Sequence, residues 1–214
     1  MPTVNGEPGT TLTPRERSMA THWRIVKAAY TLFCQRGYAG TTMAAVAKEA
    51  GVAVQTVYFA FHTKSALLSR TIDFAVMGED EPRIPQQQPW YQQMKAEPDI
   101  TRAVRHFVVG AGEIVPRVAP LNLVALASGD PEIASVAAFH NEEQADAYRA
   151  VVAILRRKVP LRAGLSVTRA TQLLLLYLGV EVYGALVNKL GWSHDDWVDW
   201  TVTTIAEQVF SDEA

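Results

Sequence analysis

The sequence predicts an all-α protein with a small N-terminal helical domain and a larger helical domain behind it. Three observations support this fold class. Apolar residues recur at helical spacing along most of the 214 residues. Thr, Ser or Asp residues that can cap a helix stand before nearly every such segment. No segment alternates apolar and polar residues for long enough to indicate a strand.

Composition limits the class of protein further. A single cysteine, Cys34, excludes a disulfide framework within the chain and is consistent with a reducing cytoplasm. The N-terminal residues lack the basic and apolar runs of a secretory signal. The most apolar stretch, Leu173–Val187, is interrupted by Glu181 and is shorter than the ~20 residues that span a bilayer. We therefore expect a buried helix there, a cytoplasmic location and no membrane partner.

The formal charge is unevenly distributed along the chain. Residues 1–78 contain eight Lys or Arg and four Asp or Glu residues, a formal charge of +4. The remainder contains twelve basic and eighteen acidic residues, a formal charge of −6. A basic N-terminal third on an acidic body is typical of a protein that meets phosphate at one end, although chance sampling of surface charges stays open.

The first helix follows a segment rich in Gly, Pro and Thr. We expect a flexible tail over residues 1–17. Thr13 can cap a helix that has Pro14 in its first turn and Glu16 at the capping-box position. Gly37 is suited to end this helix, because glycine readily takes the backbone conformation found just past a helix.

Two short helices hinged at a glycine follow. Thr42 is expected to cap a helix over residues 43–50, and a second helix covers residues 54–61. Gly51 between them can take the positive φ that a sharp turn requires. The second helix is too short to be stable alone and must lean on a neighbour. Its outer face presents groups of the kind that read base edges and hold phosphates. These are Gln55, Thr56, Tyr58 and Phe59.

The remaining helices are expected from start and stop signals. Thr63 can cap a helix that reaches about Met77, and the acidic, Pro- and Gln-rich residues 79–98 indicate a linker. Later helices are expected over residues 100–115, 121–127, 131–158, 167–189 and 194–210, capped by Asp99, Asp130, Ser166 and Ser193 and separated by Pro116, Pro120, Pro160 and Gly164.

A long set of residues at fixed spacings surrounds the helix pair. They are Ile25, Ala28, Ala29, Leu32, Phe33, Gly37, Tyr38, Thr41, Thr42, Val46, Ala47, Ala50, Gly51, Val52, Thr56, Val57, Tyr58, Phe61, Lys64, Leu67 and Leu68. This pattern, over about residues 20–70, resembles the N-terminal signature of the TetR family of transcriptional regulators. Beyond residue 78 the resemblance extends only to the general architecture.

The resemblance implies a helix-turn-helix DNA-binding domain over residues 18–65, with Val54–Phe61 as recognition helix. It implies a helical ligand-binding and dimerisation domain over residues 66–214, and a double-stranded DNA operator as partner. By position, the expected contacts are Thr42, Lys64 and Tyr58 on the DNA backbone, and Val54, Gln55, Thr56 and Phe59 on the bases. Purely structural or solvated roles stay open for Tyr58, Lys64 and Gln55.

Three positions depart from the family pattern. Ala53 stands where many relatives have Ser, so the recognition helix lacks a side-chain cap worth about 1 kcal/mol. Gln55 stands where Gly is common, and its longer amide could pair with adenine. Ala60 stands where a polar residue is frequent, and His62 could supply the lost phosphate contact.

The C-terminal half is expected to enclose a ligand. In TetR relatives such helices surround a cavity, and an aliphatic and aromatic lining favours a hydrophobic effector with a few polar anchors. Each candidate could equally be a plain core residue. The candidates are Phe74, Met77, Phe107, Phe139, His140, Tyr148 and Tyr177.

The last two helices are expected to form a dimer interface. The penultimate helix is apolar over more than one face, which is typical of a dimeric four-helix bundle, although an ordinary buried helix in a monomer stays open. The expected interface residues are Leu173, Leu176, Val180, Gly184, Trp197 and Trp200.

The predicted function is a homodimeric repressor that a small, largely hydrophobic ligand releases from a near-palindromic operator. Its recognition helices would enter major grooves about 34–36 Å apart. An activator, or a regulator that answers to a protein partner, stays open. So does a small-molecule-binding or catalytic helical protein with a purely structural helix-turn-helix. The histidines show no metal-ligand spacing and no catalytic motif is present, so we expect no enzyme activity, metal or cofactor.

Overall fold

The computed structural model describes residues 13–78 and 84–210, apart from the side chains of residues 126 and 127. Within these ranges the chain is helical, without a named strand, which confirms the predicted fold class. Residues 1–12 of the expected tail lie outside them, and its end was placed too late, because α1 begins at Pro14. The helices are α1 (Pro14–Arg36), α2 (Met43–Ala50), α3 (Val54–Phe61), α4 (Lys64–Met77), the 3₁₀ helix η1 (Pro85–Gln87), α5 (Pro89–Ala96), α6 (Ile100–Ser128), α7 (Pro131–Leu155), α8 (Val167–Tyr177), α9 (Val180–Tyr183), the π-helix η2 (Gly184–Lys189) and α10 (His194–Val209).

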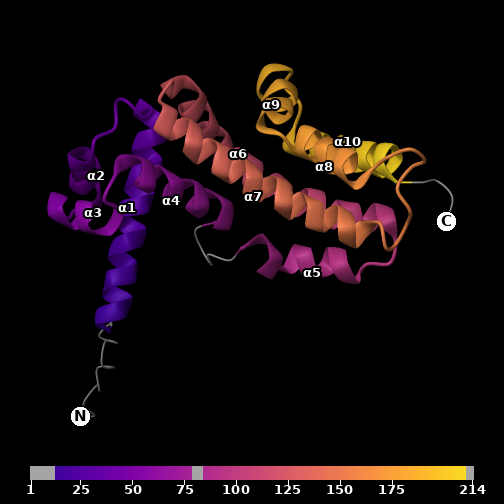
Figure 1. Ribbon diagram of the computed structural model, residues 1–214, viewed down its shortest axis with the longest axis horizontal. Coiled ribbons are helices and arrows are strands. Elements are labelled where there is room, and N and C mark those ends of the chain that lie inside the picture. Colours follow the sequence, from indigo (N-terminus) through magenta and orange to yellow (C-terminus); the bar gives the residue numbers. More distant parts are fainter. Residues whose placement is uncertain (1–12, 79–83, 211–214) are drawn as a thin grey trace, which may run out of the picture.

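The molecule is elongated, with the small N-terminal helices at one end (Figure 1). The long helices α6 and α7 lie side by side and extend away from α1–α3. α5 packs along α6, whereas α10 packs on α6 and α8 packs on α7. α4 contacts α1 and α3 on one side and α6 and α7 on the other, so it joins the two regions.

The N-terminal helices begin and end where the sequence predicts. Thr13 and Glu16 form a capping box, and the Thr42 and Thr63 side chains accept hydrogen bonds from backbone N–H groups in the first turns of α2 and α4. Gly51 takes the left-handed conformation, with φ of 65°, and turns the chain from α2 toward α3. Local capping therefore sets these boundaries.

The linker expected over residues 79–98 contains a helix. α5 begins at Pro89, and its Tyr91 and Met94 are buried against α6. The indole ring of Trp90 lies on Gly110, where a Cβ atom would come within 2.1 Å of the ring. The prediction of an irregular connection was wrong because this short helix is stabilised by its contact with α6 rather than by a periodic pattern.

The proline residues that were expected to end the helix after Val115 do not. α6 continues through Pro116 and Pro120 to Ser128. Each proline lacks one backbone N–H donor, yet α6 packs against α4, α5, α7 and α10 along its length. Tertiary packing outweighs the local preference here.

The single helix expected over residues 167–189 is interrupted. The chain breaks at Leu178 and Gly179, and then continues as α9 and η2. Gly179 has an extended backbone, and a Cβ there would lie 2.9 Å from the Leu175 carbonyl oxygen. Contact of α9 with α6 accompanies this change of direction. α7 also ends at Leu155, slightly before the expected Lys158.

Two hydrophobic clusters divide the core. One contains the buried residues of α1–α4 together with Leu121 of α6 and Ile133 of α7. The other is built from α5 to α10 and includes Phe107, Tyr148 and Trp197. Since α4 contributes its buried face to the first cluster, the apolar contacts of the N-terminal region extend beyond residue 65.

Two segments are long and apolar enough to cross a membrane by length and composition alone, Ile100–Ala125 and Val167–Lys189. The first lies within α6, which packs against α4, α5, α7 and α10 and has 39% of its apolar stretch buried. The second is interrupted at Leu178 and Gly179.

Candidate DNA-binding surface and effector region

The helix-turn-helix is held by a small apolar interior. Val46 and Val57 are fully buried, and Ala47 lies at the crossing of α2 and α3 with 3% of its surface exposed. The Val52 N–H donates to the Ala47 carbonyl oxygen at 3.0 Å, which closes the turn. The two helices therefore form a rigid unit that presents the other face of α3 outward.

The outward face of α3 is unusually apolar for an exposed surface. Phe59 is 86% exposed and Tyr58 is 50% exposed, although both are large aromatic residues. Gln55 is exposed, whereas Val54 and Thr56 are half-buried. Exposed aromatic groups beside an amide on a short helix are suited to contact base edges and the deoxyribose-phosphate backbone.

Thr42 and Lys64 lie at the N-termini of α2 and α4. The Thr42 hydroxyl accepts from the Ala45 N–H at 3.1 Å, so its side chain already has a capping role. The Lys64 ammonium donates to the Tyr38 carbonyl oxygen at 2.8 Å and lies 4.0 Å from the centroid of the Tyr38 ring. These contacts fix the Lys64 charge near a helix N-terminus, where phosphate is favoured.

His62 connects α3 to α4 with a positive φ of 59°, which is uncommon outside glycine. Its N–H donates to the Tyr58 carbonyl oxygen at 2.9 Å, and its side chain is exposed. Ala53 provides no side-chain hydrogen bond at the start of α3, as the sequence predicts. The recognition helix is therefore held by its neighbours rather than by its own cap.

The predicted ligand residues do not gather in one place. Phe107 and Tyr148 are buried together in the C-terminal cluster, with ring centroids 5.3 Å apart. Phe74 instead belongs to the N-terminal cluster, where it contacts the rings of Trp23 and Tyr30.

Phe139 does not point into the interior, contrary to expectation, because 55% of its surface is exposed. His140 lies in a polar contact between α4 and α7 instead of an apolar cavity. Tyr177 is half-buried beside Trp200, with ring centroids 5.9 Å apart, and Met77 is half-buried at the end of α4.

A groove of about 300 Å³ lies between α5 and α6. Arg102, Arg105, His106 and Trp90 are among its lining residues, and none of the predicted ligand residues is. Arg105 also pairs with Asp199 of α10 at 2.8 Å. Sequence reasoning missed this groove because it depends on α5, which was expected to be irregular.

The predicted interface residues divide into two groups. Leu176 is 54% exposed, and Leu173, Val180, Gly184 and Trp200 are half-buried on α8, α9, η2 and α10. Trp197, in contrast, is fully buried within its own chain and packs on Gly112. Trp197 is therefore a core residue, and its expected place at a subunit surface was wrong.

Cys34 lies half-buried on α1, and burial raises the pKa of its thiol. A protonated, partly covered thiol is a poor nucleophile. A polar cluster that sequence reasoning did not predict lies between α4 and α7, where Asp73 approaches His140 and Glu143. Its members are far apart in sequence, so no local spacing could have indicated it.

The N-terminal residues match a known protein family, and the whole chain shares its fold with solved structures. Residues 25–71 match the family model described as bacterial regulatory proteins, tetR family. No curated protein matches the chain. Solved structures share its fold, among them NalD, the secondary repressor of the MexAB-OprM multidrug efflux pump in Pseudomonas aeruginosa, which is 17% identical with a TM-score of 0.70 over 93% of this chain and 100% of that chain.

Two further structures have similar coverage. The transcriptional regulator FadR from Bacillus subtilis, solved in complex with stearoyl-CoA, is 15% identical with a TM-score of 0.70 over 87% of this chain and 98% of its own. A TetR-family regulator from Mesorhizobium loti is 18% identical with a TM-score of 0.60 over 91% of this chain and 99% of its own. Residues 25–71 therefore carry the N-terminal domain of the tetR family of bacterial regulatory proteins, and the chain as a whole has the fold of TetR-type regulators.

Proposed function

We propose that this protein is a DNA-binding transcriptional regulator that acts as a homodimer. Two α3 helices, one from each subunit, would enter major grooves about 34–36 Å apart on a near-palindromic operator. A small, largely hydrophobic ligand would favour a state of lower DNA affinity and so relieve repression.

The exposed face of α3 is the observation that carries the proposal. Two adjacent aromatic residues, Tyr58 and Phe59, are exposed on this short helix, and a contiguous exposed apolar patch marks a surface that contacts a partner. Phe59 is 86% exposed on a helix that is otherwise anchored by buried Val57 and Phe61. Contact of this face with DNA would cover the exposed ring and use the Lys64 charge.

The proposed dimer rests on the outer face of α8, α9 and α10. Leu176 is 54% exposed, and Leu190, just after η2, is 69% exposed. The half-buried Trp192 and Trp200 lie with ring centroids 6.1 Å apart near the start of α10. A partner subunit packed against this apolar face would remove it from water, so we expect Leu176→Asp to convert a dimer to monomers in light scattering.

The C-terminal cluster supports a ligand role. Trp197 Nε1 and Thr201 Oγ1 are buried without a hydrogen-bond partner among the described residues. A ligand that entered this mostly apolar cluster could satisfy both groups and gain orientation from them. FadR from Bacillus subtilis, solved with stearoyl-CoA, shows a long-chain ligand on the same fold.

The alternative from another class is a small-molecule-binding or catalytic helical protein whose helix-turn-helix is only structural. The apolar interior of α2–α4, with Val46, Val57 and Phe61 buried, would serve that role equally well. The exposure of Phe59 favours the regulator, because a structural helix gains nothing from it.

The direct test is a gel shift of the purified protein against DNA immediately upstream of its own gene. We expect a specific shift that Lys64→Ala and Phe59→Ala weaken at least tenfold. Lys95→Ala is the charge-matched control, since Lys95 is an exposed residue on α5, far along the chain from α3. Circular dichroism of each variant confirms that the fold is retained.

The proposal fails if no specific shift appears at low salt with this DNA or with neighbouring promoters. It also fails if the α3 and α4 variants bind as tightly as Lys95→Ala, because another surface would then hold the DNA.

A further inference from the structure

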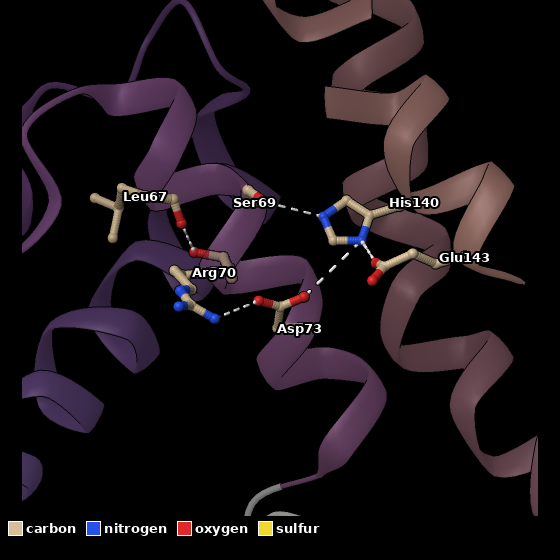
Figure 2. A network of polar contacts seen from close by, with 7 residues as sticks. Leu67, Ser69, Arg70, Asp73, His140 and Glu143 are labelled. Carbon is tan, nitrogen blue, oxygen red and sulfur yellow. Dashed lines mark hydrogen bonds and ion pairs between the residues drawn. The ribbon is translucent and has the colours of Figure 1, made fainter. Parts of the chain in front are cut away.

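One polar cluster interrupts the contact between α4 and α7 (Figure 2). Asp73 comes from α4, and His140 and Glu143 come from one face of α7. One potential ligand atom from each side chain lies within 4.8 Å of the other two. The cluster thus brings an imidazole nitrogen and two carboxylate oxygens to one point between two helices.

The imidazole ring of His140 is oriented by contacts at both nitrogens. Nε2 lies 3.1 Å from the Ser69 hydroxyl on α4. Nδ1 faces the carboxylates, 3.3 Å from Glu143 Oε2 and 3.9 Å from Asp73 Oδ1. Only 13% of the side chain is exposed, so the ring has little freedom to turn away.

This arrangement is the one found around metal-bound histidine. A ligating imidazole usually gives its other N–H to a neighbouring acceptor, which fixes the ring and its tautomer. Ser69 can be that acceptor, and Nδ1 then directs a lone pair toward two carboxylates. Lone pairs of three acceptors at one point repel one another unless a proton or a cation lies between them.

The charge around the cluster favours a divalent cation. Arg70 pairs with Asp73 through Oδ2 at 3.1 Å, which leaves Oδ1 facing the gap. Arg70 is mostly exposed, and its single charge offsets one of the two carboxylates. A divalent ion would neutralise the remaining charge and hold all three groups together.

The donor types select the kind of metal. Imidazole with carboxylates suits Zn²⁺ and the neighbouring transition metals, whereas Mg²⁺ and Ca²⁺ prefer oxygen ligands alone. Bonds of about 2.0–2.2 Å place the ligands of a tetrahedral ion roughly 3.3 Å apart. His140 Nδ1 already lies 3.3 Å from Glu143, but the ligand atoms of the cluster are spread over as much as 4.8 Å, so the side chains must move together on binding; Glu143, which is 56% exposed, has room to move inward.

We propose that Asp73, His140 and Glu143 form a binding site for Zn²⁺ or a similar transition-metal ion. Three protein ligands leave one position for water or an additional ligand. Since Asp73 lies on α4 and the other ligands on α7, a bound ion fastens α4 to α7. α4 is also the helix that contacts α1 and α3, so metal occupancy restrains the helix that joins the two regions.

The test uses untagged, full-length protein that has been treated with a chelator and dialysed. Zn²⁺ is titrated in by calorimetry, Mg²⁺ is titrated separately, and Co²⁺ supplies a visible absorption spectrum that reports the ligand set. We expect one Zn²⁺ per chain with micromolar affinity, at least 100-fold tighter than Mg²⁺. Hydrogen exchange of α4 should slow when Zn²⁺ is bound.

Asp73→Asn and His140→Gln are near-isosteric changes that keep the helices packed. Each should weaken Zn²⁺ binding tenfold or more and change the Co²⁺ spectrum. Glu142→Gln is the matched control, because Glu142 is an exposed glutamate on the same helix outside the cluster. Its affinity should equal that of the unmodified protein.

Two results would overturn the proposal. One is Zn²⁺ binding no tighter than Mg²⁺ binding, and the other is tight binding that survives both Asp73→Asn and His140→Gln. No DNA is present in these measurements, so their failure leaves the proposed regulator function intact, and failure of the gel shift leaves the metal site intact.

Discussion

The N-terminal and C-terminal regions differ in what determines their helices. In the N-terminal region, α1, α2 and α4 each begin at a threonine whose side chain caps the helix, and each ends at a glycine. α3 begins without a side-chain cap and ends at the turn that His62 makes. In the C-terminal region, α6 passes through two prolines, α5 forms where no periodic pattern indicates it, and α8 ends inside an apolar run. The first region follows local signals, and the second follows long-range packing.

The comparison shows why exposure differs between the regions. α2 and α3 need only a small interior, so a whole face of α3 remains available for a partner. The long helices of the C-terminal region bury aromatic residues in one continuous cluster and leave exposed apolar surface at Leu176 of α8 and at Leu190, just after η2. The proposed DNA contact and the proposed subunit contact therefore lie on regions built by different rules.

The largest expected effect is a loss of stability when a large buried side chain is removed from either hydrophobic cluster. Phe33 and Trp197 are both fully buried, one in each cluster. Phe33→Ala and Trp197→Ala should each lower the free energy of unfolding by about 3–5 kcal/mol, because each leaves a large cavity. Denaturant titration followed by circular dichroism measures the loss.

Hydrogen exchange of the same variants sharpens the comparison. Phe33→Ala should accelerate exchange mainly in α1–α4, and Trp197→Ala mainly in α6 and α10. Equal acceleration throughout the chain in both variants would show that the two clusters unfold as one unit.

A smaller effect is expected at the contact of α5 with α6. A Cβ atom at Gly110 would overlap the Trp90 ring, so Gly110→Ala should displace α5 and destabilise the protein by about 1–3 kcal/mol. Trp90 is half-buried, and its displacement should shift the tryptophan fluorescence to the red. Val109→Ala, an exposed change next to it, should have little effect. Stability unaffected by Gly110→Ala would mean that α5 does not need this contact.

The missing cap of the recognition helix allows a gain in stability. Ala53 has the extended backbone of an N-cap residue but no side-chain acceptor. Ala53→Ser should stabilise the protein by about 1 kcal/mol by accepting an N–H of α3. Thr42→Ala should cause a loss of similar size at α2. Thermal unfolding of both variants measures the two changes in stability. A destabilising Ala53→Ser would contradict the idea that local capping determines the N-terminal helices.

The smallest effect is a dependence of stability on pH at His22. Its imidazole packs against Phe61 with ring centroids 4.7 Å apart. Burial, followed by the charge of Arg70, lowers the pKa of His22 below its usual 6.5. The unfolded chain therefore binds the proton more readily, so this contribution is complete above pH 6.5 and is lost as the pH falls below it.

The replacement His22→Gln removes the titrating group. Between pH 7.5 and pH 5.5, the unmodified protein should lose more stability in urea than His22→Gln does, because the variant lacks the His22 imidazole. An identical loss in both proteins would show that His22 has the same pKa in the folded and unfolded chains.

The sequence alone predicts the N-terminal helices better than the C-terminal packing, for a physical reason. Caps such as Thr42 and the hinge at Gly51 act within a few residues, and they give α2 and α3 their observed boundaries. The burial of Trp197 against Gly112 depends on two helices that are far apart in the chain, and no local pattern contains it. Phe139 is 55% exposed and has Glu142 and Glu143 one turn further along the same side of α7, although its aromatic ring suggested an interior position.

The candidate site shows the same division. The exposure of Tyr58 and Phe59 agrees with the face predicted for the recognition helix. The cluster of Asp73, His140 and Glu143 could not be foreseen, because α4 and α7 meet only in the folded chain. The sequence suggested His140 as a ligand-binding residue and gave no indication that Asp73 would lie beside it.

The salt dependence of DNA affinity tests the central claim most directly. Fluorescence anisotropy would measure the dissociation constant for the upstream DNA fragment between 50 and 200 mM salt. For six or more phosphate contacts the affinity should fall by roughly 10³-fold or more over this range. Lys64→Ala should reduce the slope of log affinity against log salt concentration by about 1, because one phosphate contact is lost. Phe59→Ala should weaken binding to the specific fragment more than to unrelated DNA. An affinity that salt barely changes, or that both variants leave unaltered, would contradict the assignment of α3 and Lys64 as the DNA-binding surface.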